Sequence, residues 1–388
     1  MLRKTFVVTG AALLLAGCST TVTGTPVADP SGVPRPDTGS YATEPRAVGP
    51  MTEKVQAAAE GFRMVEIIPL APDIDGAVRY GGTPGVGRLS GIIGSTFGDG
   101  VSKVLEGLEV GAYTSAGDRA PGSDATVMGR SLIMGVFRFK DDAAARAAVD
   151  NPALFVADKA IGSDKPTPKV AVTVPGYTDA KAYSETTSST RSMVGLVANG
   201  RYVLASWTSG PVEWIKKFFD LQIPALKSFV PTPVDKFSTL TRDHDDLLKY
   251  TIAEQSATVF QATLPARTLL PAQTDISAAK QDLADTGVDY IANAGNTVYR
   301  AKDAAGAKTL GDRSIAETQA MRKGSTESTV RGVPGARCLN SPTYPGSKDT
   351  RTYCTVPVGR YLAEVTDRQE ARAKQAIGAS YLILQRAK

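Results

Sequence analysis

The sequence predicts an α+β protein of two related domains, each an antiparallel-rich sheet with helices packed on one face. The chain has 388 residues, more than one hydrophobic core usually organises. Short motifs recur in the same order at nearly one spacing, and strand and helix patterns follow the order β-α-β-β-β-α in each half. A composition of 42% hydrophobic and 21% charged residues is ordinary for a globular chain.

Three pairs of motifs indicate an internal repeat. VFRFKDDAAAR resembles VYRAKDAAGAK at an offset of 162 residues, whereas Val-Pro-Gly and Gly-Arg-Tyr each recur at an offset of 159. The pairs begin at Val136 and Val298, at Val174 and Val333, and at Gly200 and Gly359. Each match is short, so their order and spacing carry the inference that one unit is present twice.

Local signals place the elements of both units. In the first we expect a strand at 127–140, a helix capped by Asp141 and Asp142, a strand at 169–174, paired strands at 193–198 and 202–207, and a helix from Pro211. In the second we expect helices at 275–285, at 303–310 and after Asp367. Acidic residues favour helix starts, Asn-Gly at 199–200 is a strong hairpin signal, and the proline at 224 ends or kinks the helix before it.

Two stretches precede the first unit. Residues 52–65 place apolar side chains at helical spacing and predict a helix. Residues 80–100 are rich in glycine, but Gly85-x-Gly87-x-x-x-Gly91 lacks the Gly-Lys-Ser/Thr of a phosphate loop and the strand that precedes a dinucleotide fingerprint. We expect a flexible surface loop that leads into a helix of small residues.

The N-terminus has the pattern of an export signal. Arg3 and Lys4 precede an apolar run of about ten residues, which is too short to span a bilayer. Leu-Ala-Gly-Cys at 15–18 then looks like a bacterial lipobox, in which the cysteine receives a diacylglycerol and the peptide is cut before it. A cysteine that ends an ordinary signal by chance is the alternative. We expect Cys18 to carry acyl chains such as palmitate, because two or more chains anchor a protein stably without a transmembrane helix.

This signal sets the expected division of the chain. Residues 1–17 form a signal peptide, residues 18–50 a lipidated Pro-rich tether, residues 51–234 the N-terminal α+β domain and residues 235–388 the C-terminal α+β domain. The tether is rich in Pro, Gly, Ser and Thr and has no apolar periodicity, so we expect it to stay unordered, with a random-coil span of roughly 30 Å.

Cys338 and Cys354 are the two cysteines left if Cys18 carries lipid. Outside the cytosol an even pair favours a disulfide, which here closes a loop of about fifteen residues and is worth roughly 3 kcal/mol in the chain-entropy model. A pair of metal-binding thiols is the alternative, but the chain has no further cysteine and a single histidine to complete such a site. We expect a disulfide that ties two strands of the second unit.

The charge balance argues against a nucleic-acid partner. The net charge is +5, and without Arg3 and Lys4 the chain has 42 basic and 39 acidic residues. Basic residues do not gather into a run with interleaved aromatic residues. The predicted partners are the membrane, through the lipid anchor, and an envelope protein or lipid.

His244 is the single histidine, between Asp243 and Asp245. It could serve as a metal ligand or a general base, but we expect a solvated loop residue that precedes a helix. The chain has no Gly-x-Ser-x-Gly elbow. No catalytic residue, cofactor site or metal site is therefore predicted, although Ser-Lys and paired-carboxylate sites stay open.

Two apolar features suggest further alternatives. Trp207, Trp214, Phe218 and Phe219 could line an apolar pocket, but we expect an aromatic stripe that packs in the core. Residues 91–108 could lie on lipid, but three charged residues interrupt the apolar surface.

A family resemblance rests on a few of these motifs. The lipobox continues as C-S-x-x-V-x-G-x-P-V from Cys18, and the repeated motifs begin with Val-Phe-Arg-Phe at Val136 and Val-Tyr-Arg-Ala at Val298, the latter followed by Asp-Ala-Ala-Gly-Ala from Asp303. With these residues the chain resembles a family of uncharacterised lipoproteins from mycobacteria, nocardiae and related actinobacteria, built from a domain of unknown function and a distinct C-terminal domain. The resemblance implies a location in the cell envelope and supplies no catalytic residues.

From these observations we expect a lipid-anchored protein on the extracytoplasmic face of the cell membrane. Its predicted function is that of a non-enzymatic binding or interaction module. A carrier of an apolar or lipid ligand and a hydrolase with an unrecognised site are the alternatives.

Overall fold

The computed structural model describes residues 32, 34–89, 93–121, 123, 129–159, 166–187, 190–253, 260–343 and 347–387. Residue contacts separate a unit that ends at Pro34 from a body that runs from Arg35 to Lys388. Cys18 and the predicted signal peptide lie outside the described residues. Across the described part of the chain, no helix combines the length and the apolar character that crossing a membrane requires.

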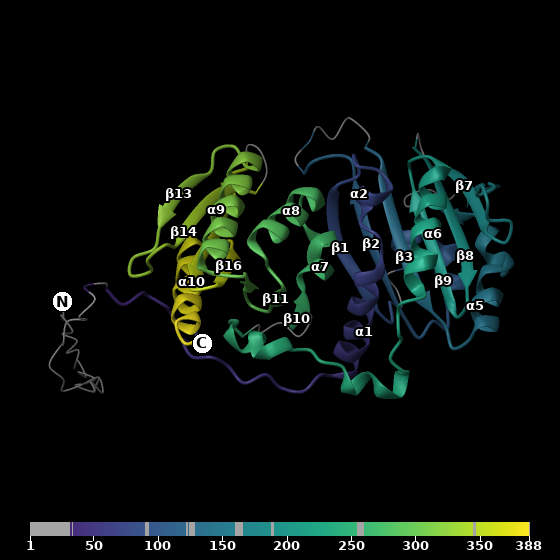
Figure 1. The fold of residues 1–388 in the computed structure, drawn as a ribbon. Coiled ribbons are helices and arrows are strands. Elements are labelled where there is room, and N and C mark those ends of the chain that lie inside the picture. The colour runs from purple at the N-terminus through teal and green to yellow at the C-terminus, as the bar shows by residue number, and fades with distance from the viewer. Residues whose placement is uncertain are drawn as a thin grey trace, which may run out of the picture. The chain divides into compact units, whose positions relative to one another are not determined.

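A seven-stranded antiparallel sheet organises the N-terminal domain, in the order β1-β2-β3-β9-β8-β7-β6 (Figure 1). Its strands are β1 (Tyr80–Gly87), β2 (Val110–Gly117), β3 (Ser131–Arg138), β6 (Val170–Ala171), β7 (Lys181–Thr187), β8 (Thr190–Asn199) and β9 (Tyr202–Thr208). A small separate sheet pairs β4 (Asp158–Lys159) with β5 (Pro166–Thr167). The helices are α1 (Glu53–Ile67), α2 (Ala71–Ile74), α3 (Ile93–Phe97), α4 (Asp99–Val104), α5 (Asp142–Val149), η1 (Pro152–Phe155), α6 (Val212–Leu226) and η2 (Val234–Thr239).

A second seven-stranded antiparallel sheet organises the C-terminal domain, in the order β10-β11-β12-β16-β15-β14-β13. Its strands are β10 (Ala262–Pro265), β11 (Tyr290–Asn293), β12 (Thr297–Arg300), β13 (Thr326–Thr329), β14 (Arg337–Pro342), β15 (Thr350–Val358) and β16 (Tyr361–Asp367). The helices are η3 (His244–Tyr250), α7 (Ala266–Leu269), η4 (Leu270–Ala272), α8 (Ile276–Thr286), α9 (Ala304–Met321) and α10 (Glu370–Leu384).

The two sheets are built in the same way. In each, three strands run up and down from one edge, a helix crosses the sheet, and four strands return from the opposite edge until the last pairs with the third. The register agrees as well, because Phe137 pairs with Val203 in the first sheet and Tyr299 pairs with Leu362 in the second. The predicted α+β fold of two domains is confirmed.

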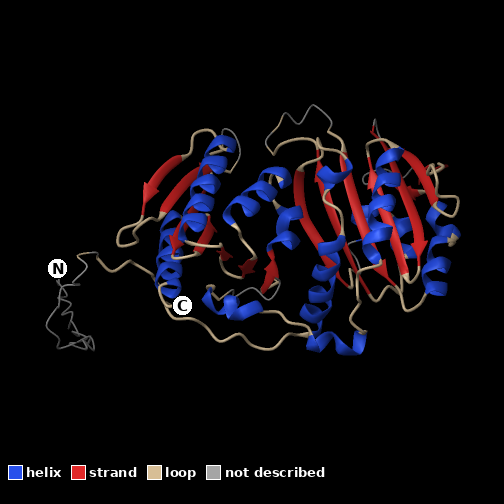
Figure 2. Cartoon of the chain, in the orientation of Figure 1, coloured by secondary structure: helices blue, strands red, loops and turns tan. Residues whose placement is uncertain are grey.

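Helices cover both faces of each sheet, which corrects the expectation of helices on one face (Figure 2). In the N-terminal domain α1 and α6 share a core with one face, and α3, α4 and α5 pack on the other. In the C-terminal domain η3 and α10 cover one face, and α7 and α9 cover the other. The reason is visible in β3, where the neighbours Val136 and Phe137 point to opposite faces and both are fully buried, so each face needs a cover.

The glycine-rich stretch predicted as a surface loop begins as the edge strand β1. Helix α1 packs closely on this strand. A Cβ on Gly61 of the helix would lie 2.7 Å from the Gly87 nitrogen and 2.8 Å from the Val86 Cβ. Glycine is therefore needed for the close contact of helix and strand, and the phosphate-loop interpretation has no support here.

Residues 35–50, which we call the strap, lie along the C-terminal domain, so the expected lack of order is wrong for this part of the predicted tether. Pro36 is buried over α10, where a Cβ on Gly378 would lie 3.3 Å from the Pro36 Cβ. Arg46 donates to the Thr251 hydroxyl at 3.1 Å. The strap has too few apolar residues to fold alone, but the domain supplies the partners that it lacks.

Most helix starts follow the local signals. Asp141 and Asp303 accept backbone N–H bonds as the N-caps of α5 and α9. Two details differ from prediction: α9 continues to Met321, and Gln369 rather than Asp367 is the N-cap of α10. Asp367 instead accepts the backbone N–H of Gln369 at 2.8 Å, and so supports the same helix start from outside it.

Candidate functional site

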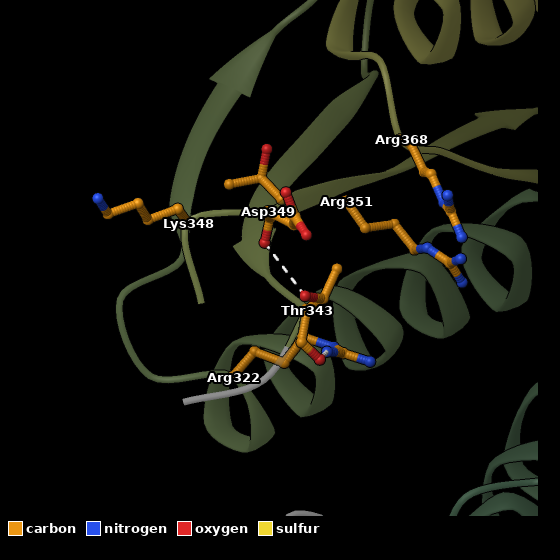
Figure 3. A pocket seen from close by; sticks show the side chains of 7 residues that line it. Arg322, Thr343, Lys348, Asp349, Arg351 and Arg368 are labelled. Carbon is orange, nitrogen blue, oxygen red and sulfur yellow. Dashed lines mark hydrogen bonds between the residues drawn. The ribbon is translucent and has the colours of Figure 1, made fainter. Parts of the chain in front are cut away.

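Four cations surround a pocket in the C-terminal domain, which we call the basic pocket (Figure 3). It has a volume of about 700 Å³ and is lined by Arg322, Thr343, Lys348, Asp349, Thr350, Arg351 and Arg368. Arg322 follows α9, and Lys348 lies in the loop between β14 and β15. Arg351 stands near the start of β15 and Arg368 just after the end of β16. Because β15 and β16 are antiparallel partners, the start of one and the end of the other meet at the same end of the sheet.

The cations differ in their partners. Arg322 donates to the carbonyl oxygens of Pro342 and Thr343 at 3.2 and 3.0 Å, which holds its side chain at the pocket. Arg351 and Arg368 are exposed and have no hydrogen-bond or ionic partner among the described residues. In Figure 3 their side chains extend in the same direction from β15 and from the end of β16. Two unpaired guanidinium groups at one pocket create a positive potential that favours an anion.

The loop that carries Lys348 is held from within. The carbonyl oxygen of Asp349 accepts the backbone N–H of Thr343 at 2.9 Å and its hydroxyl at 3.2 Å. These bonds fix the loop against β14, and the exposed side chain of Lys348 extends away from Arg351 and Arg368 in Figure 3. The pocket therefore combines a fixed backbone with the two unpaired guanidinium groups of Arg351 and Arg368.

A second cavity of about 420 Å³ extends the basic pocket along β16. It shares Arg351 and Arg368 with the basic pocket and adds Thr366, Asp367, Gln369 and Arg372. The Arg372 guanidinium lies 3.5 Å from the Asp367 carboxylate, and a hydrogen bond with Tyr41 of the strap raises its pKa. Tyr41 of the strap thus lies at the edge of the second cavity.

A third cavity, which we call the Glu364 pocket, continues from the second. It has a volume of about 310 Å³ and is lined by Asn293, Ala294, Gly295, Asn296, Thr297, Tyr353, Glu364 and Thr366, the last of which also lines the second cavity. The hydroxyls of Tyr353 and Tyr299 donate to the two Glu364 carboxylate oxygens at 2.5 and 3.0 Å. A half-buried carboxyl between two phenols is thus open to the cavity.

Burial governs the protonation of this cluster. It raises the pKa of the Glu364 carboxyl above its usual value, and hydrogen bonds from the tyrosine hydroxyls oppose the rise. Burial and the neighbouring Glu364 raise the pKa of both Tyr299 and Tyr353 well above the usual value. Both phenols therefore stay protonated as donors, and Ser314 of α9 donates as well. An ionised carboxylate has about four acceptor sites, so these three donors do not use all of them.

The predicted disulfide is confirmed: Cys338 and Cys354 are bonded across β14 and β15, where they are a register pair. The matching pair in the N-terminal sheet is Ala182 and Gly195. A shift of 159 residues relates Cys354 to Gly195 but does not relate Cys338 to Ala182, because β14 and β7 differ in their distance from the next strand. The bridge is buried beneath α10 and lies apart from the three cavities.

His244 is half-buried rather than solvated. It begins η3, and its ring stacks on Tyr290 with the ring centroids 4.9 Å apart. With Glu66, Phe62 and Phe260 it lines a further cavity of about 380 Å³ whose walls are mainly apolar. Burial raises the pKa of the Glu66 carboxyl there. In the described parts of the chain, no three or more His, Cys, Asp and Glu residues gather as metal ligands would.

The aromatic residues divide between the two faces of the N-terminal sheet. Trp214, Phe218 and Phe219 of α6 are buried in the core, as expected. Trp207 of β9 packs on the opposite face, so the four do not form one stripe or one pocket. The described part of residues 91–108 forms α3 and α4, whose apolar side chains are buried against the sheet rather than free for lipid.

The site residues were not predicted from the sequence. Lys348 and Arg351 are three residues apart, but Arg322 and Arg368 lie in other segments and join them only in the folded domain. Glu364 had an available signal, because the offset of 159 between the Gly-Arg-Tyr motifs aligns it with Ala205. A carboxyl at a position where the N-terminal domain has a buried alanine marks a departure from packing needs.

Two family models match the chain. The N-terminal model of DUF7373, described as a domain of unknown function, matches residues 48–242, and its C-terminal counterpart matches residues 240–387. A search of the curated proteins found no match. Among solved structures, the extracellular domain of PknH from Mycobacterium tuberculosis covers 47% of this chain and 100% of its own, with 10% sequence identity and a TM-score of 0.27. A likeness at that TM-score carries no argument.

Proposed function

The chain belongs to the DUF7373 family, whose description names no activity, and on this premise we propose that it is a non-enzymatic binding protein that holds an anionic group in its basic pocket. The observation that carries the proposal is the pair Arg351 and Arg368. Both guanidinium groups line one pocket, and neither has a partner among the described residues. A phosphate or carboxylate would supply the acceptors that these donors lack.

Calorimetric titration of the full chain with inorganic phosphate tests the site. We expect Arg351→Ala and Arg368→Ala each to weaken binding about tenfold, because a hydrogen bond to a charged group contributes about 1.5–3 kcal/mol. Arg331→Ala is the matched control, since Arg331 is an exposed arginine of the same domain outside the pocket. Equal affinity in all three variants, or no phosphate binding by the unaltered chain, would contradict the proposal.

The same protein is proposed to be a lipoprotein anchored at Cys18 on the extracytoplasmic face of the cell membrane, as the resemblance to actinobacterial lipoproteins suggests. Support comes from the export-signal pattern before Cys18 and from the Cys338–Cys354 disulfide, which is typical of compartments outside the cytosol. We expect Cys18→Ala to move the protein from carbonate-washed membranes to the soluble fraction. Retention of the variant on the membranes would count against the anchor.

We also infer that the two domains are copies of one unit. The shared strand order supports this, and so does one interaction present in both: Arg201 donates from Nε to the Phe139 carbonyl at 2.8 Å, and Arg360 to the Ala301 carbonyl at 2.8 Å. An experimental structure should superpose one sheet on the other with these arginines aligned. A different strand order in either sheet would refute the inference.

The mainly apolar cavity beside His244 supports a second candidate function, the carriage of a small apolar ligand. Phe62 and Phe260 face each other there with ring centroids 4.7 Å apart, and Glu66 supplies one polar group. Native mass spectrometry of the purified chain should then show a copurified apolar molecule that Phe62→Ala loses. A clean mass of the unaltered chain would reject this candidate.

A further inference from the structure

The Glu364 pocket occupies a place that the N-terminal domain fills with apolar side chains. Strand register makes Thr297 the counterpart of Gly135 and Glu364 the counterpart of Ala205, because these pairs are cross-strand neighbours in their sheets. In the N-terminal domain a Cβ on Gly135 would lie 3.1 Å from the ring of Phe97. Helix α3 therefore inserts an aromatic ring where the C-terminal domain has a cavity.

The surrounding positions show the same exchange. The counterparts of Tyr299 and Tyr353 are Phe137 and Val194, by the register of the paired strands. Both of these are fully buried in an apolar cluster that also contains Ala205. The fold thus forms with an apolar face at these positions, and the polar cluster in the C-terminal domain is not needed for folding.

A half-buried carboxyl lowers the stability of the fold unless hydrogen bonds or a ligand compensate for its lost hydration. Burial disfavours its charged form, and the hydrogen bonds from Tyr353, Tyr299 and Ser314 of α9 compensate only in part. The carboxyl still faces a cavity that also presents the side chains of Asn293, Thr297 and Thr366. These side chains offer hydrogen-bond acceptors, neutral donors and the edge of an aromatic ring. Such a set suits the hydroxyls of a polyol better than it suits an apolar ligand.

The Glu364 pocket and the basic pocket lie on one surface. Glu364, Thr366 and Arg368 follow one another at every second residue along β16 and its end, and Tyr353 and Arg351 do the same on β15. Side chains two residues apart on a strand point to the same face about 7 Å apart. Glu364 and Arg368 are four residues apart, so roughly 13 Å of strand separates them. The three cavities are connected through lining residues that they share.

We propose that the ligand of this surface is an anionic saccharide, whose phosphate or carboxylate lies in the basic pocket and whose hydroxyls bind in the Glu364 pocket. This inference rests on the anion site proposed above and deepens it. The Glu364 carboxylate accepts bonds from sugar hydroxyls, and Thr366, which lines the connecting cavity, lies between the two ends. A ligand of one or two sugar rings has the length that the surface requires.

Titrations of the full chain with three probes test this proposal. The probes are inorganic phosphate, glucose 6-phosphate and cyclohexyl phosphate, of which the last has a ring of similar size without hydroxyls. We expect glucose 6-phosphate to bind about tenfold more tightly than cyclohexyl phosphate, as one or two hydrogen bonds to a charged acceptor would provide. Equal binding of the two sugar-sized probes by the unaltered chain would overturn the proposal.

Two variants locate the effect. Glu364→Gln keeps the size of the side chain and should bring the ratio of the two affinities close to one, with phosphate affinity unchanged. Thr366→Val keeps the shape of an exposed residue and should reduce the ratio by about threefold, as the loss of one neutral hydrogen bond predicts. A ratio that neither variant changes would reject the hydroxyl site.

The outcomes separate this inference from the anion site on which it rests. If Arg351→Ala weakens phosphate binding while the probe ratio is one, the anion site stands and the saccharide proposal fails. If the ratio depends on Glu364 while Arg351→Ala leaves phosphate binding unchanged, the anion site fails instead. Parallel loss of affinity for every probe in Glu364→Gln would assign Glu364 a purely structural role and also overturn the proposal.

Discussion

The N-terminal and C-terminal sheets share strand order and register, but they use the same positions differently. Beneath α3 and α5 the first sheet is apolar, with Phe137 and Ala205 in a closed cluster. Beneath α9 the second sheet carries Tyr299 and Glu364 and opens into a cavity. The first domain fills these positions with packed apolar side chains and the second does not, which is why we propose the C-terminal domain as the binding domain.

The opposite faces of the two sheets differ in a complementary way. In the first sheet Gly195 leaves room for Ile215 of α6, since a Cβ on the glycine would lie 2.8 Å from Ile215 Cγ2. In the second sheet the matching strand pair is the disulfide, which belongs to one buried cluster with Ala373 and Ala376 of α10. The large side chain therefore comes from the helix in the first domain, whereas the sheet contributes the bulky sulfur pair in the second.

The third strand of each sheet ends in an arginine, and substitution of these two arginines should give the largest difference in the free energy of unfolding. Arg138 is 1% exposed and donates to Glu60, which is fully buried, at 3.1 Å. Its counterpart Arg300 pairs with Asp289 and Asp245, whose side chains are 47% and 68% exposed. Breaking a buried pair leaves an uncompensated charge, whereas exposed pairs contribute little.

We therefore expect Arg138→Ala to lower the free energy of unfolding by about 3–5 kcal/mol, and Arg300→Ala by about 1 kcal/mol. Urea unfolding of both variants measures this. The double variant Arg138→Met, Glu60→Gln should recover part of the loss, because it removes both charges. Equal effects of the two alanine variants would show that burial does not distinguish the arginines.

The disulfide is the second difference between the domains. Replacing both cysteines, Cys338→Ala with Cys354→Ala, should lower the free energy of unfolding by about 3 kcal/mol, because the unfolded chain loses a closed loop. The N-terminal sheet has Ala182 and Gly195 at these positions, so its unfolding should not respond. Denaturation with and without a reducing agent checks the result: reduction should destabilise the unaltered chain and leave the variant unchanged.

Local chemistry made much of the fold predictable. A cap such as Asp141, the Asn199-Gly200 hairpin and the even pair of cysteines each act over a few residues or through composition, so sequence reveals them. Strand β1 was missed because its sequence has almost no apolar residues and pairs through its backbone. The order of the strap was missed because its partners, such as Gly378, lie far along the chain.

The candidate site could not be predicted as a unit. Arg322, Arg351 and Arg368 come together because the ends of α9 and β16 and the start of β15 lie at the same pocket. No local sequence pattern encodes that meeting. Only Glu364 carries a signal that sequence could supply, through its alignment with Ala205. Two sheets with the same strand order are informative here, because the apolar sheet shows which residues packing alone can use at each position.

The smallest expected effect concerns the pH dependence that Glu364 adds to the C-terminal domain. Its pKa is raised in the folded state, above the usual 4.5, so the native state binds the proton more tightly than the unfolded state. Its contribution to stability is therefore present at low pH and is lost as pH rises from 4.5 through the folded-state pKa. Tyr299, Tyr353 and the acidic Glu317 of α9 face this group, and Glu317 also has a raised pKa because of burial.

Glu364→Gln removes this titration while it keeps the shape of the side chain. We expect the variant to gain stability relative to the unaltered chain as the pH rises from 4.5 through the folded-state pKa, because the unaltered chain must then ionise a buried carboxyl. Urea unfolding at several pH values measures the difference, in which the remaining carboxyls cancel. A difference that is constant with pH would mean that Glu364 has the same pKa in the folded and unfolded states, and would contradict the expected effect of its burial.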